Sequence, residues 1–368
     1  MPRRLCATLL LALLHGAAAA QARPPPQFGT QPSQLQPQLQ PQLQSHRGFQ
    51  LQERGGLQAA QLAVVINDAD PASVAVGDYY RRRRAIPEAN VVHVRIAGKP
   101  RSLEPERFLA LKEEIDRQLG PDIQAVLMVW TAPYAVACNS ITGAYTLGFD
   151  AALCRDTCAA GRPSPYFNAD STRPHASHGM RLSMLLPTES VAAAKDLIDR
   201  GVASGFRLVP ASAYYLTTLE APRNSRAVFF PPAGRIDAKK LATRRLRAEA
   251  LENARDIMIY QLGKASVGKL DTLHFLPGAL ADHLTSHGGD LLGARQMSSL
   301  RWLEAGATAS YGTVSEPCNH WQKFPNPAVL LRHYVQGNSA IEAYWKSVAW
   351  PAQGLFIGEP LAAPYRRR

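Results

Sequence analysis

Short apolar runs alternate with helix-like segments from about residue 61 onward, and this alternation constrains the fold more than any other feature. Residues 62–66 (LAVVI) form an apolar run, Asp70-Pro71 is a typical helix start, and residues 90–96 (NVVHVRI) alternate like a strand. A strand, a helix and a strand at this spacing form a βαβ unit, whose strands lie parallel in one sheet. The sequence therefore predicts an α/β fold.

The same pattern recurs toward the C-terminus. Further strands are predicted at 123–129, 181–186, 273–276 and 354–357, and one lies within 206–219, centred on residues 214–216. Helices are predicted at 108–119, 188–203 (capped by Thr188), 237–262 and 296–305. Two more helices follow, the second opened by a capping box of Ser339 and Glu342. We predict one three-layer α/β domain over residues 59–365, with a mainly parallel sheet flanked by helices. A Cys-containing stretch without periodicity predicts an insertion at about 130–180.

The first 58 residues have a different character. Arg3 and Arg4 precede an apolar stretch that ends at Ala20-Gln21-Ala22, which predicts a signal peptide over residues 1–22. Residues 23–58 are rich in Gln and Pro and predict a disordered spacer. No later stretch resembles a membrane span, so we expect an exported protein, periplasmic or secreted, without a transmembrane segment after cleavage.

The chain is basic, with 41 Lys and Arg against 29 Asp and Glu. Such an excess favours an acidic partner such as an envelope polymer. Nucleic acid is disfavoured, because the residues 81–84 (RRRR) are typical of a helix end and 366–368 (RRR) form a terminus. No phosphate-binding glycine motif follows the first strand, so no nucleotide cofactor is predicted. The sequence gives no oligomeric state.

Four cysteines remain after signal cleavage, namely Cys138, Cys154, Cys158 and Cys318. An even number in an exported protein favours two disulfides, for which three connectivities are open. The alternative is that Cys318 is unpaired and reactive.

Polar residues gather at three predicted strand ends, where ligands bind in α/β sheets. These are Asn67, Asp68 and Asp70 after the first strand, the segment 282–290, and the segment 310–318. If the three groups lie close together in the fold, they form one pocket. If they lie far apart, they are ordinary polar loop residues.

One hypothesis is a hydrolase with a nucleophile and a histidine base. The predicted catalytic residues are His287 as the base, Ser310 or Cys318 as the nucleophile, and Asp282 or Glu316 as the orienting carboxylate; the predicted substrate-binding residues are Asn67, Asp68, Asp70 and Thr285. The competing interpretation of Ser310 is a turn hydroxyl bonded to backbone, and that of His287 is an ordinary loop residue.

A metal site is the weaker alternative. Asp282, His283, His287, Asp290, Glu316 and His320 offer oxygen and nitrogen ligands. No H-E-x-x-H or EF-hand pattern occurs, so no resident metal is predicted.

Several strings resemble an uncharacterised family of exported bacterial proteins, found mainly in bacteria with exosortase-type protein sorting. They include VVINDADPASVAVGDYYRRRRAIPEANVV, LADHLTSHGGDL, QMSSLRWLEAGATASYGTVSEPCN, KFPNP, EAYWKSVAWP and GEPLAAPY. The resemblance covers about residues 60–365 and implies a bacterial envelope setting rather than a reaction.

A more distant resemblance is to gingipain-type cysteine peptidases of the caspase-like fold, in which a His-Gly pair follows one parallel strand and a Cys follows the next. Residues 286–288 (SHG) are similar to the first element, and residues 307–312 (ATASYG) to the second, with Ser310 where the resemblance implies cysteine. The resemblance implies a peptidase-like hydrolase or a degenerate relative. The competing function is a non-catalytic envelope protein that binds a peptide or glycan, and a metal-dependent hydrolase is third.

Overall fold

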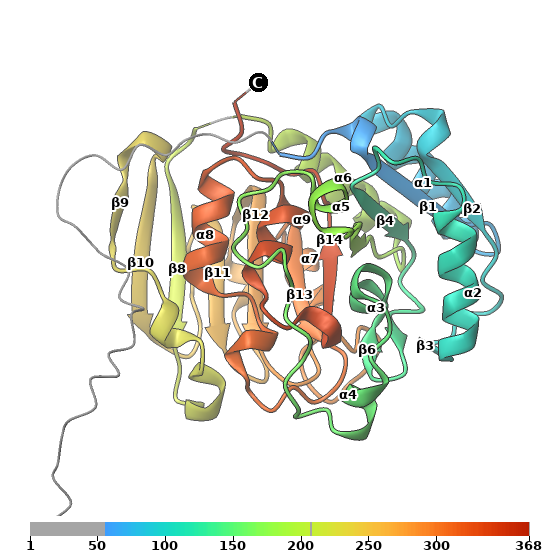
Figure 1. Cartoon of the computed structure of the whole chain (residues 1–368). Helices are drawn as coiled ribbons and strands as arrows, with labels where there is room; N and C mark the ends of the chain where they lie inside the picture. Colours follow the sequence, from blue (N-terminus) through green and yellow to red (C-terminus); the bar gives the residue numbers. More distant parts are fainter. Residues whose placement is uncertain (1–55, 207, 368) are drawn as a thin grey trace, which may run out of the picture. The chain divides into compact units, whose positions relative to one another are not determined.

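The computed structural model describes residues 56–206 and 208–367 (Figure 1). The predicted signal peptide and nearly all of the predicted spacer lie outside these residues. The strands are β1 (Leu62–Asn67), β2 (Val91–Val94), β3 (Ser102–Leu103), β4 (Ala125–Val129), β5 (Ala135–Val136), β6 (Asn139–Ser140), β7 (Leu182–Leu185), β8 (Ala211–Thr217), β9 (Gly234–Ile236), β10 (Leu241–Arg247), β11 (Ile257–Gly263), β12 (Phe275–Leu284), β13 (Ala309–Thr313) and β14 (Gly354–Gly358). The α-helices are α1 (Pro71–Arg84), α2 (Pro105–Asp116), α3 (Ile141–Leu147), α4 (Ala151–Arg155), α5 (Pro174–His178), α6 (Val191–Ala203), α7 (Leu300–Glu304), α8 (Pro327–Val335) and α9 (Ala340–Ser347).

One eleven-stranded sheet runs through the described residues, in the order β2-β1-β4-β7-β14-β13-β12-β11-β8-β10-β9. Parallel pairing joins β2, β1, β4 and β7, and it also joins β13, β12, β11, β8 and β10. Between these groups, β14 runs antiparallel to β13 and meets β7 through one residue pair, Ile357 opposite Leu185. A small second sheet contains β3, β5 and β6.

The strands of the two groups end at the same side of the sheet. Helix α6 returns from the end of β7, and Arg200 in its last turn donates to the carbonyl of Ala307, just before β13 begins. At the opposite side, the Tyr134 hydroxyl, in the loop after β4, donates a hydrogen bond of 2.5 Å to Asp290, in the loop after β12. We call this second side the carboxyl edge, because β4, β7, β12 and β13 all end there.

Helices cover both faces of the sheet, so the predicted three-layer α/β architecture is confirmed. Helices α8 and α9 lie in front of the sheet in Figure 1, while α6 and α7 lie behind it. The strands between the layers are almost wholly buried: β1, β4, β7, β11, β13 and β14 have no exposed residue. Such continuous apolar burial is typical of a sheet covered on both faces.

Local signals placed several helices correctly. Asp70 accepts a hydrogen bond from the Ala72 backbone and caps α1, with Pro71 as its first residue. The predicted capping box of Ser339 and Glu342 opens α9. Helix α6 begins later than predicted, because Ser190 rather than Thr188 is its cap. Among the described residues, no helix combines the length and the apolar character needed to cross a membrane.

The helix predicted over 237–262 is wrong, since this stretch contains β10 and β11. Strand β10 lies near the edge of the sheet, and its last four residues are exposed on both faces. It therefore lacks the alternation of buried and exposed residues that marks a strand in a sequence. The intervening segment, rich in Ala, Glu and Leu, adds a helical bias that tertiary pairing overrides.

The strand predicted at 273–276 is also too short, because β12 continues through Pro277-Gly278 to Leu284. The register against β11 shifts at this point, so the Pro-Gly pair forms a bulge instead of a turn. Gly278 has a φ of +89°, its N–H donates to Thr308 and its carbonyl accepts from Tyr334. As a result, Asp282 and His283 lie inside the sheet rather than in a loop.

Candidate functional site

The candidate site is the part of the carboxyl edge formed where β8, β11, β12 and β13 end. The loop after β12 crosses directly against β13: a Cβ on Gly312 would lie 2.3 Å from the carbonyl carbon of Gly288, and one on Gly289 would lie 2.5 Å from the Gly312 oxygen. Only glycine permits so close an approach of two backbones. Gly289 and Gly312 therefore have a packing role that the sequence pattern alone did not reveal.

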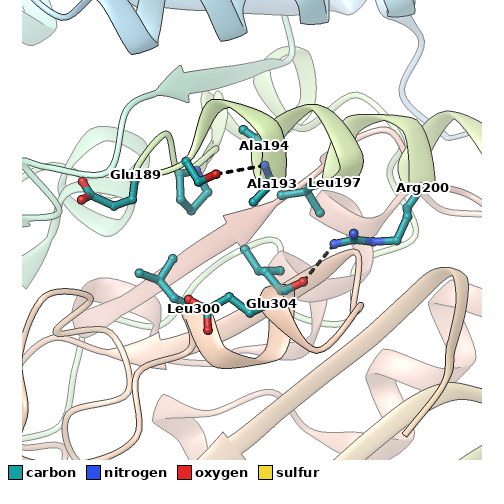
Figure 2. A pocket seen from close by; sticks show the side chains of 10 residues that line it. Glu189, Ala193, Ala194, Leu197, Arg200, Leu300 and Glu304 are labelled. Atoms are coloured by element: carbon teal, nitrogen blue, oxygen red, sulfur yellow. Dashed lines mark hydrogen bonds between the residues drawn. The ribbon is translucent and has the colours of Figure 1, made fainter. Parts of the chain in front are cut away.

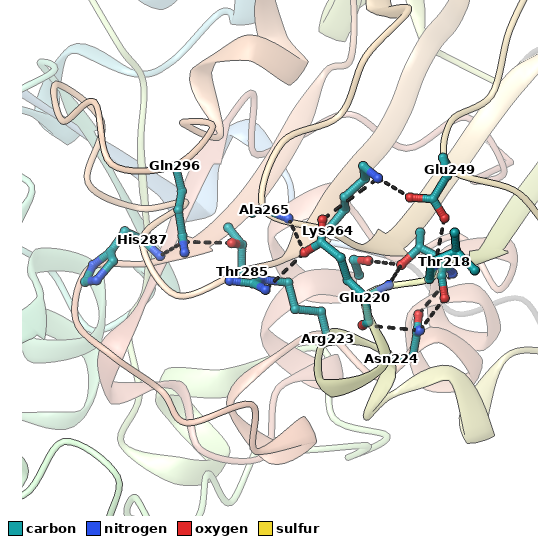
Figure 3. Close-up of polar contacts among 12 residues, drawn as sticks. Thr218, Glu220, Arg223, Asn224, Glu249, Lys264, Ala265, Thr285, His287 and Gln296 are labelled. Carbon is teal, nitrogen blue, oxygen red and sulfur yellow. Dashed lines mark hydrogen bonds and ion pairs between the residues drawn. The ribbon is translucent and has the colours of Figure 1, made fainter.

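Gln296 holds this loop in place. Its Oε1 accepts hydrogen bonds from the Thr285 hydroxyl at 2.7 Å and from the His287 backbone N–H at 2.8 Å. The His287 ring is partly exposed, points away from Gln296 (Figure 3), and has no hydrogen-bond partner within residues 56–206 and 208–367. The backbone is thus fixed while the imidazole is left available.

An ionic network lies beside Thr285 and follows the ends of β8 and β11 (Figure 3). Glu220 accepts from Arg223 and from the Ala265 backbone N–H, both at 3.0 Å. Lys264 pairs with Glu249, and this hydrogen bond is the main reason that the pKa of Glu249 lies below its usual value. Glu220 and Arg223 remain about a quarter to a third exposed, so the network is open to a ligand.

Ser310 does not reach the carboxyl edge. It is the second residue of β13, is fully buried opposite Ile357, and its hydroxyl has no hydrogen-bond partner among the described residues. The strand continues for three residues beyond it, roughly 10 Å at about 3.3 Å per residue. The serine that does stand at the strand end, Ser315, donates to the Cys138 carbonyl and accepts from Gln353 instead of from an imidazole.

Cys318 is not a nucleophile, because it forms a disulfide with Cys158. Cys138 and Cys154 form the second bridge. The prediction of two disulfides is confirmed, and the alternative of an unpaired Cys318 is wrong. A disulfide sulfur has no thiolate to attack a substrate.

The two predicted orienting carboxylates have other partners. Asp282 lies within β12, is fully buried, pairs with Arg226 at 2.5 Å and accepts from Gln261 at 2.8 Å. Glu316 accepts from the backbone N–H of Cys318 two residues later, at 2.8 Å. No hydrogen bond joins either carboxylate to His287 in the described part of the chain.

The residues predicted at the end of β1 lie elsewhere. Four strands lie between β1 and β12 in the sheet. The five interstrand spacings, at roughly 4.8 Å each, place the two strands about 24 Å apart. The Asn67 side chain holds the backbone of Ile96, Asp68 pairs with His93 at 2.7 Å, and Asp70 caps α1. The predicted convergence with the segment 282–290 is therefore wrong for this group, although Thr285 does lie beside His287.

The metal alternative has no support in the described residues, which contain no group of three or more His, Cys, Asp or Glu side chains placed to hold an ion. His283 uses both ring nitrogens, since Nδ1 accepts from Trp302 at 2.9 Å and Nε2 lies 3.1 Å from the Met297 carbonyl. Its ring therefore serves the core.

A groove opens next to Gln296. It is lined by Ser266, Leu291, Gly293, Ala294, Arg295, Gln296, Met297, Ser298, Leu300, Arg301 and Glu304. Leu300 and Glu304 also line an adjoining small pocket between α6 and α7 (Figure 2). In that pocket the Arg200 guanidinium donates to the Leu303 carbonyl at 2.9 Å. We call the eleven lining residues the edge groove.

The sequence interpretation missed Glu220, Arg223, Glu249, Lys264 and Gln296. Glu220 follows β8 by three residues and Lys264 follows β11 directly, so polarity just after a strand would have identified both. The helix wrongly predicted over 237–262 concealed the end of β11. Nothing in the local sequence marks Gln296, because its role depends on contacts with residues nine and eleven positions away.

No protein-family model matches the chain, and no curated protein matches it in sequence. Among solved structures, it is similar to the Arg-specific cysteine proteinase gingipain R, with a TM-score of 0.44 and 10% identity over 83% of this chain and 78% of that chain. It is also similar to the complex of the pro- and mature domains of RgpB from Porphyromonas gingivalis, with a TM-score of 0.40 and 10% identity over 83% and 79%. Likeness at this level carries no argument about activity, and the link to exosortase-type sorting stays a prediction.

Proposed function

We propose that the protein is an exported, non-catalytic binding protein that holds a peptide in the edge groove beside His287. The observation that carries the proposal is the state of the two predicted nucleophiles. Cys318 is oxidised in a disulfide and Ser310 is buried below the strand end, while the groove stays open and the His287 ring stays partly exposed. The site keeps its binding surface and lacks an available nucleophile of the predicted kind.

The composition of the groove favours a peptide over a glycan. Leu291, Met297 and Leu300 supply apolar surface. Arg295 supplies positive charge, whereas Arg301 pairs with Glu304 of the same lining. The eleven lining residues include no aromatic ring on which the flat face of a sugar could stack. The groove thus combines apolar and polar surface in similar amounts, which suits the mixed side chains and polar backbone of a peptide.

The test is to screen a library of synthetic six-residue peptides for binding to the purified full-length protein. Ala294 is exposed in the groove, so Ala294→Trp should fill it without disturbing the core and should weaken the best peptide at least tenfold. Ala60→Trp is the matched control, because Ala60 is exposed just before β1, where that strand starts rather than ends. A library without any binder, or equal binding by both variants, would overturn the proposal.

Catalysis is tested in the same preparation with fluorophosphonate and iodoacetamide probes. We expect no labelling of the oxidised protein by either probe. Labelling that disappears in Ser310→Ala, or peptide cleavage that disappears in His287→Ala, would replace the binding function with a hydrolase.

A further inference from the structure

The outer side of β10 is an unpaired sheet edge over its second half. Strand β10 pairs with β8 along its whole length, from Leu241 to Arg247. On its other side, β9 covers only Leu241 to Thr243. Among the described residues no strand lies beside residues 244–247, which are all exposed.

The pairing with β8 determines which backbone groups point outward. The Ala211 N–H donates to the Lys240 carbonyl at 3.0 Å, and the Ala248 N–H donates to the Thr217 carbonyl at 3.3 Å. In a parallel ladder, alternate residues of a strand bond the same neighbour. The even-numbered residues of β10 thus bond β8, and the N–H and C=O groups of Arg245 and Arg247 point away from it.

The side chains give this edge a positive charge. Arg244, Arg245 and Arg247 are all exposed. Arg244 is held over the Tyr214 ring and donates to Ser212 at 3.0 Å, whereas Arg245 and Arg247 form no ion pair within the described residues. The two residues whose backbone groups point outward therefore also carry free guanidinium groups.

From this arrangement we infer that β10 binds an extended acidic segment of another protein, which adds to the sheet as a new strand. Backbone hydrogen bonds to Arg245 and Arg247 supply the pairing, as in other cases of strand addition. Charges on an edge strand also guard against pairing of identical edges. A second copy would place arginines opposite arginines, which is unfavourable, whereas alternating Glu residues would match them.

The test uses a fluorescein-labelled peptide of alternating Glu and Val, six residues long, with the full-length protein in low salt. Fluorescence anisotropy should show binding that weakens as salt screens the charges. Two further peptides carry N-methyl groups on either the odd or the even amides, which removes donors without changing charge. Strand addition predicts that one methylated peptide binds at least tenfold more weakly than the other.

The variant Arg245→Gln/Arg247→Gln should weaken the unmodified peptide at least fivefold. Arg107→Gln/Arg117→Gln removes the same charge from exposed positions on and beside α2 and should leave the affinity unchanged. Equal binding of both methylated peptides would overturn strand addition in favour of charge attraction alone. Dimerisation that protects the Arg245 and Arg247 amides from hydrogen exchange without peptide would overturn the choice of partner.

Discussion

Strand β12 and the loop that follows it are adjacent in the sequence, yet they use polar residues in opposite ways. Inside β12, Asp282 and His283 are fully buried and hydrogen-bonded to side chains of the core. Beyond Leu284, the loop backbone is fixed while the His287 ring is left to solvent. The strand end thus separates polar groups that stabilise the fold from groups that are available to a ligand.

The largest effect that tests this contrast is expected for Asp282→Ala. Removing the carboxylate leaves the Arg226 guanidinium, which is 1% exposed, without its ion-pair partner. We expect the free energy of unfolding in urea at pH 7 to fall by about 3–5 kcal/mol. The double variant Asp282→Leu/Arg226→Met should lose less, because no unpaired charge stays buried. A loss below about 1 kcal/mol in the single variant would show that the polar residues inside β12 do not stabilise the fold more than those in the loop.

The next effect concerns pH. Burial, aided by the charge of Arg226, lowers the pKa of His283 to about 3. The unfolded chain binds a proton near pH 6.5 while the folded ring stays neutral, so stability is lost as pH falls from 6.5 toward 3. Between pH 7 and 5 this residue should lower the free energy of unfolding by about 2 kcal/mol. His283→Gln should remove that part of the pH dependence in urea titrations, and an unchanged dependence would contradict the assignment.

A smaller effect is expected at the boundary, in Gln296→Ala. The variant loses the acceptor for the Thr285 hydroxyl and the His287 N–H. Because both bonds are partly exposed, we expect a loss of about 1 kcal/mol in the free energy of unfolding. Hydrogen exchange at the His287 amide should become faster, while amides in the middle of β12 keep their protection. Equal acceleration in both places would show that loop and strand open as one unit.

The smallest effect on stability is expected for His287→Ala. Its ring has no hydrogen bond in the described residues, so the free energy of unfolding should change by no more than about 0.5 kcal/mol. The affinity for the peptide bound in the edge groove should nevertheless fall, which anisotropy titration will measure. A stability loss above 1 kcal/mol with unchanged affinity would place His287 with His283 among the structural residues.

The sequence predicted the α/β architecture because most strands are continuous apolar runs and several helices carry their own caps, such as Asp70. It missed the length of β12, because Pro277-Gly278 is typical of a turn. The bulge there is stabilised by Thr308 and Tyr334, which are 30 and 56 residues from Gly278. Asp282 and His283 were therefore interpreted as loop residues with chemistry of their own.

Only part of the predicted site lies together in the structure, for a similar reason. His287 and Thr285 do lie at the carboxyl edge, because the strand before them was recognised. Ser310 is excluded because it lies inside β13, and Cys318 is excluded because it is paired with Cys158. The spacing of residues in the sequence predicts neither the position within the strand nor the disulfide pairing. The order of strands in the sheet separated Asn67, Asp68 and Asp70 from the rest, which no local pattern encodes.

The bridge between Cys158 and Cys318 has a topological consequence for a chain that is cut by a protease. Every strand from β7 to β13 lies between these two cysteines, which are 160 positions apart. A protease that cuts the exposed chain anywhere in this span, for example around β9, leaves the two fragments covalently joined. They separate only when the bridge is reduced, so a nicked molecule keeps both halves of its sheet together.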